Sequence, residues 1–62
     1  MAYPIEIRER QRDTLSSLLE LKKDNEGINI VGLDGKIRRA VAVMDGEDVA
    51  WVERVIGVKA ID

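Results

Sequence analysis

The sequence predicts an α+β fold in which a helix, a two-stranded antiparallel β-hairpin and a second helix follow one another, with both helices on one face of the hairpin. Asp34-Gly35 separates two apolar-rich runs at 28–33 and 36–44, and Asp-Gly between such runs favours a tight hairpin turn. Apolar residues at helical spacing flank this central stretch on both sides. Because the chain has 62 residues, we expect a single small domain, 1–62.

A first helix is predicted from residue 4 or 5 to residue 25. Pro4 suits a first helical turn, because its missing N–H would have no partner there anyway. One side of the helix collects apolar residues, which are Leu15, Leu18 and Leu19 with Ile7 near the edge. The opposite side collects acids, which are Glu6, Glu9, Asp13, Glu20 and Asp24. This pattern predicts that the second half of the helix covers the core.

The first half of this helix leaves two interpretations open. Its apolar side is continued by polar residues, which are Arg8, Gln11 and Arg12. Such side chains are rarely buried without partners, so the first turns either project into solvent or contact another chain. Alternatively, the helix begins near Thr14 with Asp13 as its N-cap, and residues 1–12 are mobile.

The hairpin is predicted to begin after Gly27, which suits the end of the first helix. If Asp34 and Gly35 form a type I′ turn, Gly35 has a positive φ. One face of the ribbon is then the core face, and it carries Ile28, Ile30, Ile37, Val41 and Val43. Arg39 is the one charged residue on this face. The other face carries Val31, Leu33, Ala40, Ala42 and Met44, and is too apolar for plain water. Because a two-stranded ribbon is only marginally stable by itself, helices, a second chain or both must cover it.

A second helix is predicted to begin after Asp45, whose carboxylate suits the N-cap position. Glu47 and Asp48 are favourable in the first turn, because the amino end of a helix is positively polarised. The apolar stripe of this helix, with Trp51 beside it, consists of Val49, Val52, Val55 and Ile56. Gly57 is a natural stop. Residues 58–62 either fray or add a short strand.

The composition excludes several classes of function. The chain has no Cys and no His, which removes disulfides, the usual zinc ligands and the side chain best suited to proton transfer near pH 7. The carboxylates gather on a predicted solvent side, where nothing raises a pKa towards neutrality. We therefore expect no enzyme activity, no cofactor, no metal site and no small-molecule substrate. The longest uncharged stretch, 27–33, is too short to span a bilayer, so we expect a cytoplasmic protein without a membrane contact.

The net charge of −2 at pH 7 makes nucleic acid an unlikely general partner, because affinity for phosphates needs positive charge. The stretch 27–44 is nevertheless basic, and the stretch from 45 onward is acidic. Since neighbouring strand residues point to opposite faces, Arg39 is expected to pair with an acid such as Asp48 or to reach around the core. The alternative function is a nucleic-acid contact made by the basic hairpin and the first helix, through Arg8, Arg12, Lys36 and Arg38.

A protein–protein contact is the leading functional prediction. A chain this short, without disulfide or metal, gains little net stability from its own core, because conformational entropy offsets nearly all of the burial. Open hairpin edges also favour strand addition. We therefore expect a non-catalytic interaction or assembly protein that binds itself, as a homo-oligomer, or another protein. The predicted interface combines the second hairpin face with the edge of the second helix, through Val31, Leu33, Ala40, Ala42, Met44 and Trp51.

Three features of the sequence carry a resemblance to a known family. They are Leu15-Ser-Ser-Leu18-Leu19 in the first helix, the strand-Asp34-Gly35-Lys36-strand turn, and Asp45 leading into Val49-Ala-Trp-Val52. Together they resemble the small lambda W-type head-to-tail joining proteins of tailed phages, over about residues 13–57. The resemblance implies a non-enzymatic structural protein that is monomeric or weakly associating by itself, gains a partner during virion assembly and has a place in the virion. Those proteins have a basic tail, whereas this chain ends Gly57-Val-Lys-Ala-Ile61-Asp62.

Overall fold

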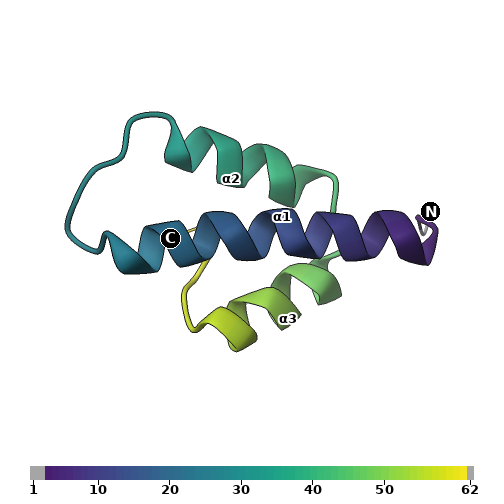
Figure 1. Ribbon diagram of the computed structural model, residues 1–62. Helices are drawn as coiled ribbons and strands as arrows, with labels where there is room; N and C mark the ends of the chain where they lie inside the picture. Colours follow the sequence, from purple (N-terminus) through teal and green to yellow (C-terminus); the bar gives the residue numbers. More distant parts are fainter. Residues whose placement is uncertain (1–2, 62) are drawn as a thin grey trace.

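The structure, a computed structural model, describes residues 3–61 and consists there of three α-helices joined by irregular segments (Figure 1). The helices are α1 (Ile5–Asp24), α2 (Leu33–Ala42) and α3 (Gly46–Ile56). No strand occurs among the described residues. The fold is therefore all-helical, and the predicted α+β fold with a β-hairpin is wrong. Residues 1–2 and 62, which belong to the ends predicted as mobile or frayed, lie outside the described residues.

Helix α1 confirms the prediction of a long first helix. It begins at Ile5 with Pro4 as the N-cap, so the alternative start near Thr14 is wrong. Leu15 and Leu19 of its apolar side are fully buried, and the acids of the opposite side are exposed. Asn25 is the C-cap, and its side-chain amide donates to a carbonyl of the last turn at 2.9 Å. The amphipathic pattern was therefore sufficient to predict this element.

Helix α2 occupies the segment that was predicted as the turn and second strand. Leu33, Ile37, Ala40 and Val41 of this helix lie at helical spacing and are buried or half-buried, whereas Ala42 is exposed. Asp34 lies in the first turn, where a carboxylate favours a helix. On a strand, Arg39 would have pointed into the core, whereas on the helix it is exposed. The helical conformation thus avoids a buried charge that the hairpin would have required.

The Asp34-Gly35 pair lies within α2, and Gly35 does not have the positive φ that a type I′ turn requires. The chain changes direction before this pair, at Gly32. This residue is the N-cap of α2 and has a left-handed φ of +82°, which glycine adopts without steric cost. The turn of the chain therefore lies at Gly32, at the start of a helix, and not at Asp34-Gly35 as predicted.

The hydrophobic core lies between the three helices and the C-terminal segment. Its buried members are Leu15, Leu19, Leu33, Ile37, Val52 and Ala60. The core face predicted for the hairpin is only partly confirmed. Ile37 is fully buried, and Ile30 and Val41 pack against the core. Ile28 and Val43 are exposed, because the connection and the helix turn them away from it.

Helix α3 confirms the second predicted helix. Asp45 is its N-cap, although the carboxylate makes no capping hydrogen bond, and Gly57 ends it with a φ of +84°. Val52 is fully buried, whereas Val55 of the same predicted stripe is exposed. Because Val55 is exposed, the part of the α3 surface that is buried is narrower than the predicted apolar stripe.

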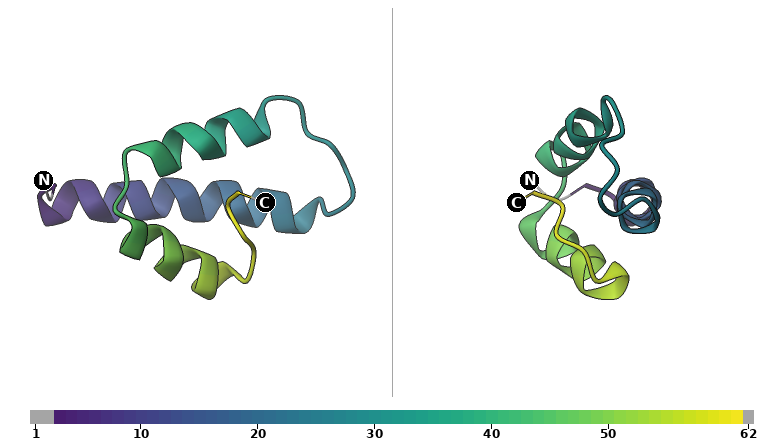
Figure 2. Two further views of the ribbon diagram at one scale, coloured as in Figure 1. Left: turned by 180° about the vertical axis from the view of Figure 1, so that it is seen from behind. Right: turned by 90° about the vertical axis from the view of Figure 1, so that its left-hand side faces the viewer.

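Helix α1 packs against both α2 and α3, which contact each other less. Seen along α1, the other two helices lie on one side of it, and segment 58–61 runs between them (Figure 2). This segment is neither a strand nor frayed at Ala60, which is buried. The backbone N–H of Ala60 donates to Oε2 of Glu53 at 2.8 Å, and Nζ of Lys22 donates to the carbonyl of Lys59 at 3.2 Å. The segment therefore closes the side of the core that α1 leaves open.

Candidate functional site

The described residues hold neither a metal-binding group nor a membrane-spanning element. Within 3–61, no cluster of acids has the arrangement that would hold a metal ion. None of the three helices combines the length and the apolar content needed to cross a membrane. The features described below include two contacts between α1 and α3, a cleft and an exposed apolar face.

The first contact is an ion pair between α1 and α3. Arg8 Nε donates to Asp48 Oδ2 at 3.0 Å, and Arg8 Nη2 donates to Asp48 Oδ1 at 3.0 Å. Because Asp48 is buried, these parallel hydrogen bonds offset the cost of removing its carboxylate from water. The hydrogen bond from Arg8 holds the pKa of Asp48 below its usual value, although burial acts in the opposite direction. The predicted pairing of Arg39 with Asp48 is wrong, and Arg39 Nε donates to the carbonyl of Gly35 at 3.4 Å.

The second contact lies one helical turn further along α1. The guanidinium carbon of Arg12 lies over the ring of Trp51, 5.2 Å from its centroid, at cation–π distance. Nearby, Gln11 Nε2 donates to the carbonyl of Val43 at 3.2 Å. The polar residues that continue the apolar side of α1 therefore all contact other parts of the same chain. Neither of the two roles predicted for these turns, projection into solvent or contact with another chain, is needed to explain them.

The four residues of the alternative nucleic-acid contact do not form one surface. Arg8 and Arg12 are engaged by side chains of α3. Lys36 and Arg38 lie two positions apart on α2, and residues at that spacing point in different directions on a helix. Arg38 borders a small hollow beside the C-terminal segment. The basic ribbon that motivated this alternative is absent from the described structure.

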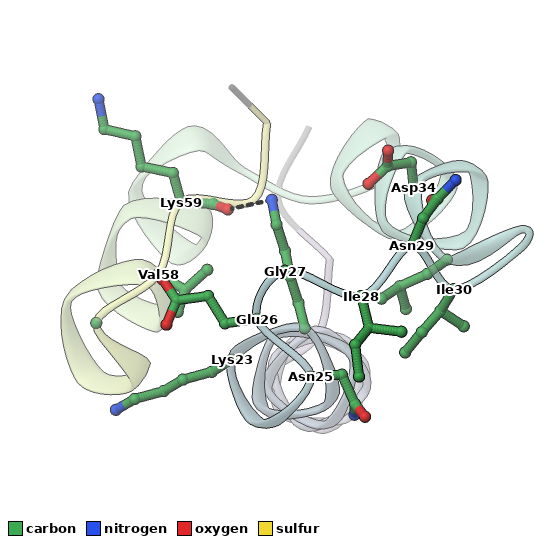
Figure 3. Close-up of a pocket in the computed structure, with 13 residues that line it drawn as sticks. Lys23, Asn25, Glu26, Gly27, Ile28, Asn29, Ile30, Asp34, Val58 and Lys59 are labelled. Carbon is green, nitrogen blue, oxygen red and sulfur yellow. Dashed lines mark hydrogen bonds between the residues drawn. The ribbon is translucent and has the colours of Figure 1, made fainter.

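A cleft of about 590 Å³ lies where α1 ends, α2 begins and α3 ends (Figure 3). Two of its three lysines donate to backbone carbonyls: Lys23 Nζ to Ile56 at 3.1 Å, and Lys22 Nζ to Lys59, the bond dashed in Figure 3. The carboxyl ends of α1 and α3, which are negatively polarised, and the amino end of α2, which is positively polarised, all lie here. Lys22 and Lys23 therefore connect α1 to the end of α3 and to the segment that follows it.

The six residues predicted as a protein interface do not share one face. Leu33 is buried in the core, and Met44 packs against the core. Ala40 packs partly against the core and lines a groove between α1 and α2. The other three are spread over the surface. Val31 lies in the connection between α1 and α2 and is 95% exposed, Ala42 lies on α2, and Trp51 lies on α3. The set was derived from a hairpin face, and the helix distributes the same residues around its axis.

An exposed apolar face follows the groove between α1 and α2. The groove has a volume of about 220 Å³ and is lined by Ile7, Arg10, Gln11, Thr14, Ala40 and Val43. Ile7, Thr14 and Leu21 succeed one another along α1 at intervals of about two helical turns, so they share one side of it. Exposed fractions are 41% for Ile7, 43% for Leu21 and 49% for Val43. We define the α1/α2 face as Ile7, Thr14, Leu21, Ala40 and Val43.

Charged residues of opposite sign lie on the two helices that form the α1/α2 face. On α1, beyond the apolar residues, an acidic row consists of Glu6, Asp13 and Glu20. On α2, a basic row consists of Lys36, which lies on the same side of the helix as Ala40 and Val43, and Arg39, which lies just beyond Val43. Within residues 3–61, neither row takes part in an ion pair of the chain. The groove is therefore flanked by acids on the α1 side and by bases on the α2 side, and Arg10 of α1 contributes to its lining.

Comparison of the chain with models of protein families, with curated proteins and with solved structures finds no match. The comparisons therefore do not bear on the resemblance to phage joining proteins. One of the three features behind that resemblance, the strand-turn-strand around Asp34-Gly35, is helical in the structure. The functional argument consequently rests on the geometry of the chain alone.

Proposed function

We propose that this chain is a non-catalytic protein–protein interaction protein that associates with itself through the α1/α2 face. The observation that carries the proposal is this face itself, an apolar groove with exposed large side chains between the acidic row and the basic row. Apolar surface with a polar rim is the usual composition of a binding site for another protein. Self-association is the function that this composition supports best.

A second copy is the partner that the charges of this face favour. The acidic row lies on α1 and the basic row on α2, so the same surface supplies both halves of an electrostatic match. Burial of the face would also add apolar contacts to a small core, which contains six buried apolar residues within 3–61. Both effects favour a symmetric assembly over an isolated chain.

Asp48, whose pKa is the one clearly shifted among the acids of residues 3–61, supports a non-catalytic role. Asp48 has a lowered pKa, so it is ionised at neutral pH and does not supply a proton there. Both of its oxygens accept hydrogen bonds from Arg8. The ion pair is therefore best understood as a connection between α1 and α3.

Self-association is tested by measuring the mass of the protein over a hundredfold range of concentration by sedimentation equilibrium. We expect a concentration-dependent mass above that of one chain, and a melting temperature that rises with concentration. Ile7→Glu should weaken association about tenfold or more, because it places a charge in the apolar middle of the face. A monomer mass throughout, with a constant melting temperature, would overturn the proposal.

Ile5→Glu is the matched control for Ile7→Glu. Both isoleucines are exposed in the first turns of α1, so both changes have similar effects on the helix itself. Ile5 does not line the groove between α1 and α2. The control should therefore keep the association of the wild-type chain, and an equal loss in both variants would assign the effect to the helix rather than to the face.

A further inference from the structure

We infer that two copies of the chain pair face to face with α1 of each copy against α2 of the other, around a two-fold axis that runs parallel to these helices. This inference rests on the proposed self-association and specifies its geometry. A two-fold axis along the groove exchanges the left and right edges of the face. The acidic row of one copy then lies over the basic row of the other, on both sides of the dimer.

The competing arrangement has its two-fold axis across the helices. It would place α1 of one copy against α1 of the other, with acidic row against acidic row. Like charges brought together across an interface oppose binding and shift the preference to another arrangement. The charges of this chain therefore select the pairing of α1 with α2.

The groove fixes which residues lie at the same level along the helices. Helices α1 and α2 run antiparallel (Figure 1), and Thr14 shares the lining of the groove with Ala40. An axis parallel to the helices leaves these levels unchanged. Asp13 of one copy accordingly comes beside Arg39 of the second copy, and Glu20 lies nearest Lys36 of the second copy.

Arg10 also fits this arrangement, although it is a base on the acidic helix. It lines the same groove as Val43, which is the C-cap of α2. In the dimer its guanidinium lies near the carboxyl end of α2 in the second copy. That end is negatively polarised, so a cation there is favourable.

Charge reversal tests the pairing. The double variants Lys36→Glu/Arg39→Glu and Asp13→Lys/Glu20→Lys each give both rows the same sign, so each should self-associate about tenfold or more weakly at low salt. An equimolar mixture of the two should recover association as a heterodimer, because each copy then complements the other at both rows. Arg38→Glu/Arg54→Glu makes the same change of charge away from the face and is the control that should leave association unchanged. Circular dichroism of every variant establishes that each remains helical.

Cysteine cross-linking gives an independent test, because the natural chain has no Cys to interfere. A mixture of Asp13→Cys and Arg39→Cys should form a disulfide between the two different chains on oxidation. Asp13→Cys by itself should form markedly less, because in the proposed dimer α1 of one copy faces α2, not α1, of the other.

The outcomes separate this inference from the proposed function. A wild-type chain that stays monomeric overturns both. A dimer whose association is unaffected by charge reversal, or whose Asp13→Cys variant cross-links efficiently to itself, overturns the α1-to-α2 pairing and leaves self-association standing. Recovery in the mixture together with the Asp13–Arg39 cross-link confirms the pairing.

Discussion

At the scale of single residues, the ion pair of Arg8 with Asp48 predicts a specific dependence of stability on pH. The folded-state pKa of Asp48 lies below its unfolded value of about 4. The pair therefore stabilises the protein fully above about pH 4, and this contribution is lost as the pH falls through the lowered folded-state pKa. Arg8→Met removes the partner and leaves the buried carboxylate, so it should lower the urea midpoint of unfolding most above pH 4.

Urea unfolding at a series of pH values from 2 to 7 measures this effect. The difference between wild type and Arg8→Met should shrink towards the acidic end, where Asp48 becomes protonated. Arg54→Met is the control, since Arg54 is an exposed arginine of α3 and takes part in no ion pair within the described residues. A constant difference across the pH range would show that Arg8 acts by packing rather than through its charge.

The sequence indicated that Arg8 is unusual but not what it contacts. Its position on the apolar side of a helix showed that this arginine needs a partner. Asp48 is 40 positions away, and its helical position was itself predicted correctly. What brings the two together is the angle at which α1 crosses α3, which depends on the packing of the whole core. Such a pair is therefore beyond the reach of helix-by-helix reasoning.

At the scale of elements, Gly35 distinguishes the observed helix from the hairpin. In the helix Gly35 has no positive φ, and an added Cβ would meet only the Arg39 side chain at 3.7 Å, an ordinary contact. Gly35→Ala should therefore raise the free energy of unfolding by about 0.5–1 kcal/mol, because alanine favours a helix over glycine. A hairpin turn at this position would give the opposite sign, since alanine is strained at positive φ.

Gly32→Ala is the companion variant, with the same chemical change three positions earlier. Gly32 has a φ of +82°, so alanine there should lower the free energy of unfolding by about 1 kcal/mol. Chemical denaturation of both variants measures the two values. Opposite signs at the two glycines support the start of α2 at Leu33, and a loss of stability at Gly35 would contradict it.

Two of the three helices were predicted from the sequence because their apolar spacing fits a helix and not a strand. In α1 and α3 the apolar spacing and the residues at the ends, such as Pro4 and Gly57, all indicate a helix. The apolar residues of 28–44 fit the two-residue period of a strand and also the 3.6-residue period of a helix. The Asp-Gly pair likewise suits a hairpin turn and also the first turn of a helix. The charge of Arg39 decides between them, because only the helix leaves it exposed. That signal was present in the sequence but was outweighed by the turn motif.

At the scale of the whole molecule, half of the α1/α2 face was visible in the sequence. The repeat of Ile7, Thr14 and Leu21 along a predicted helix marks one of its sides as apolar. The other half comes from Ala40 and Val43, which a strand would have placed on opposite faces. Because the segment of α2 was predicted as a hairpin, the face that α2 forms with α1 could not be predicted. For the same reason, the residues predicted as an interface lie on different sides of the molecule.

The C-terminal segment, 58–61, closes the core between α2 and α3, and this role can be tested by substitution. Ala60 lies there with 4% of its surface exposed, whereas the neighbouring Ile61 is 47% exposed. Ala60→Asp should lower the free energy of unfolding by about 2 kcal/mol or more, because it buries a carboxylate among apolar residues. Ile61→Asp introduces the same group one position later and should change stability by only about 0.5 kcal/mol. If thermal unfolding shows equal effects for both, the segment does not close the core, and the bundle depends on its three helices alone.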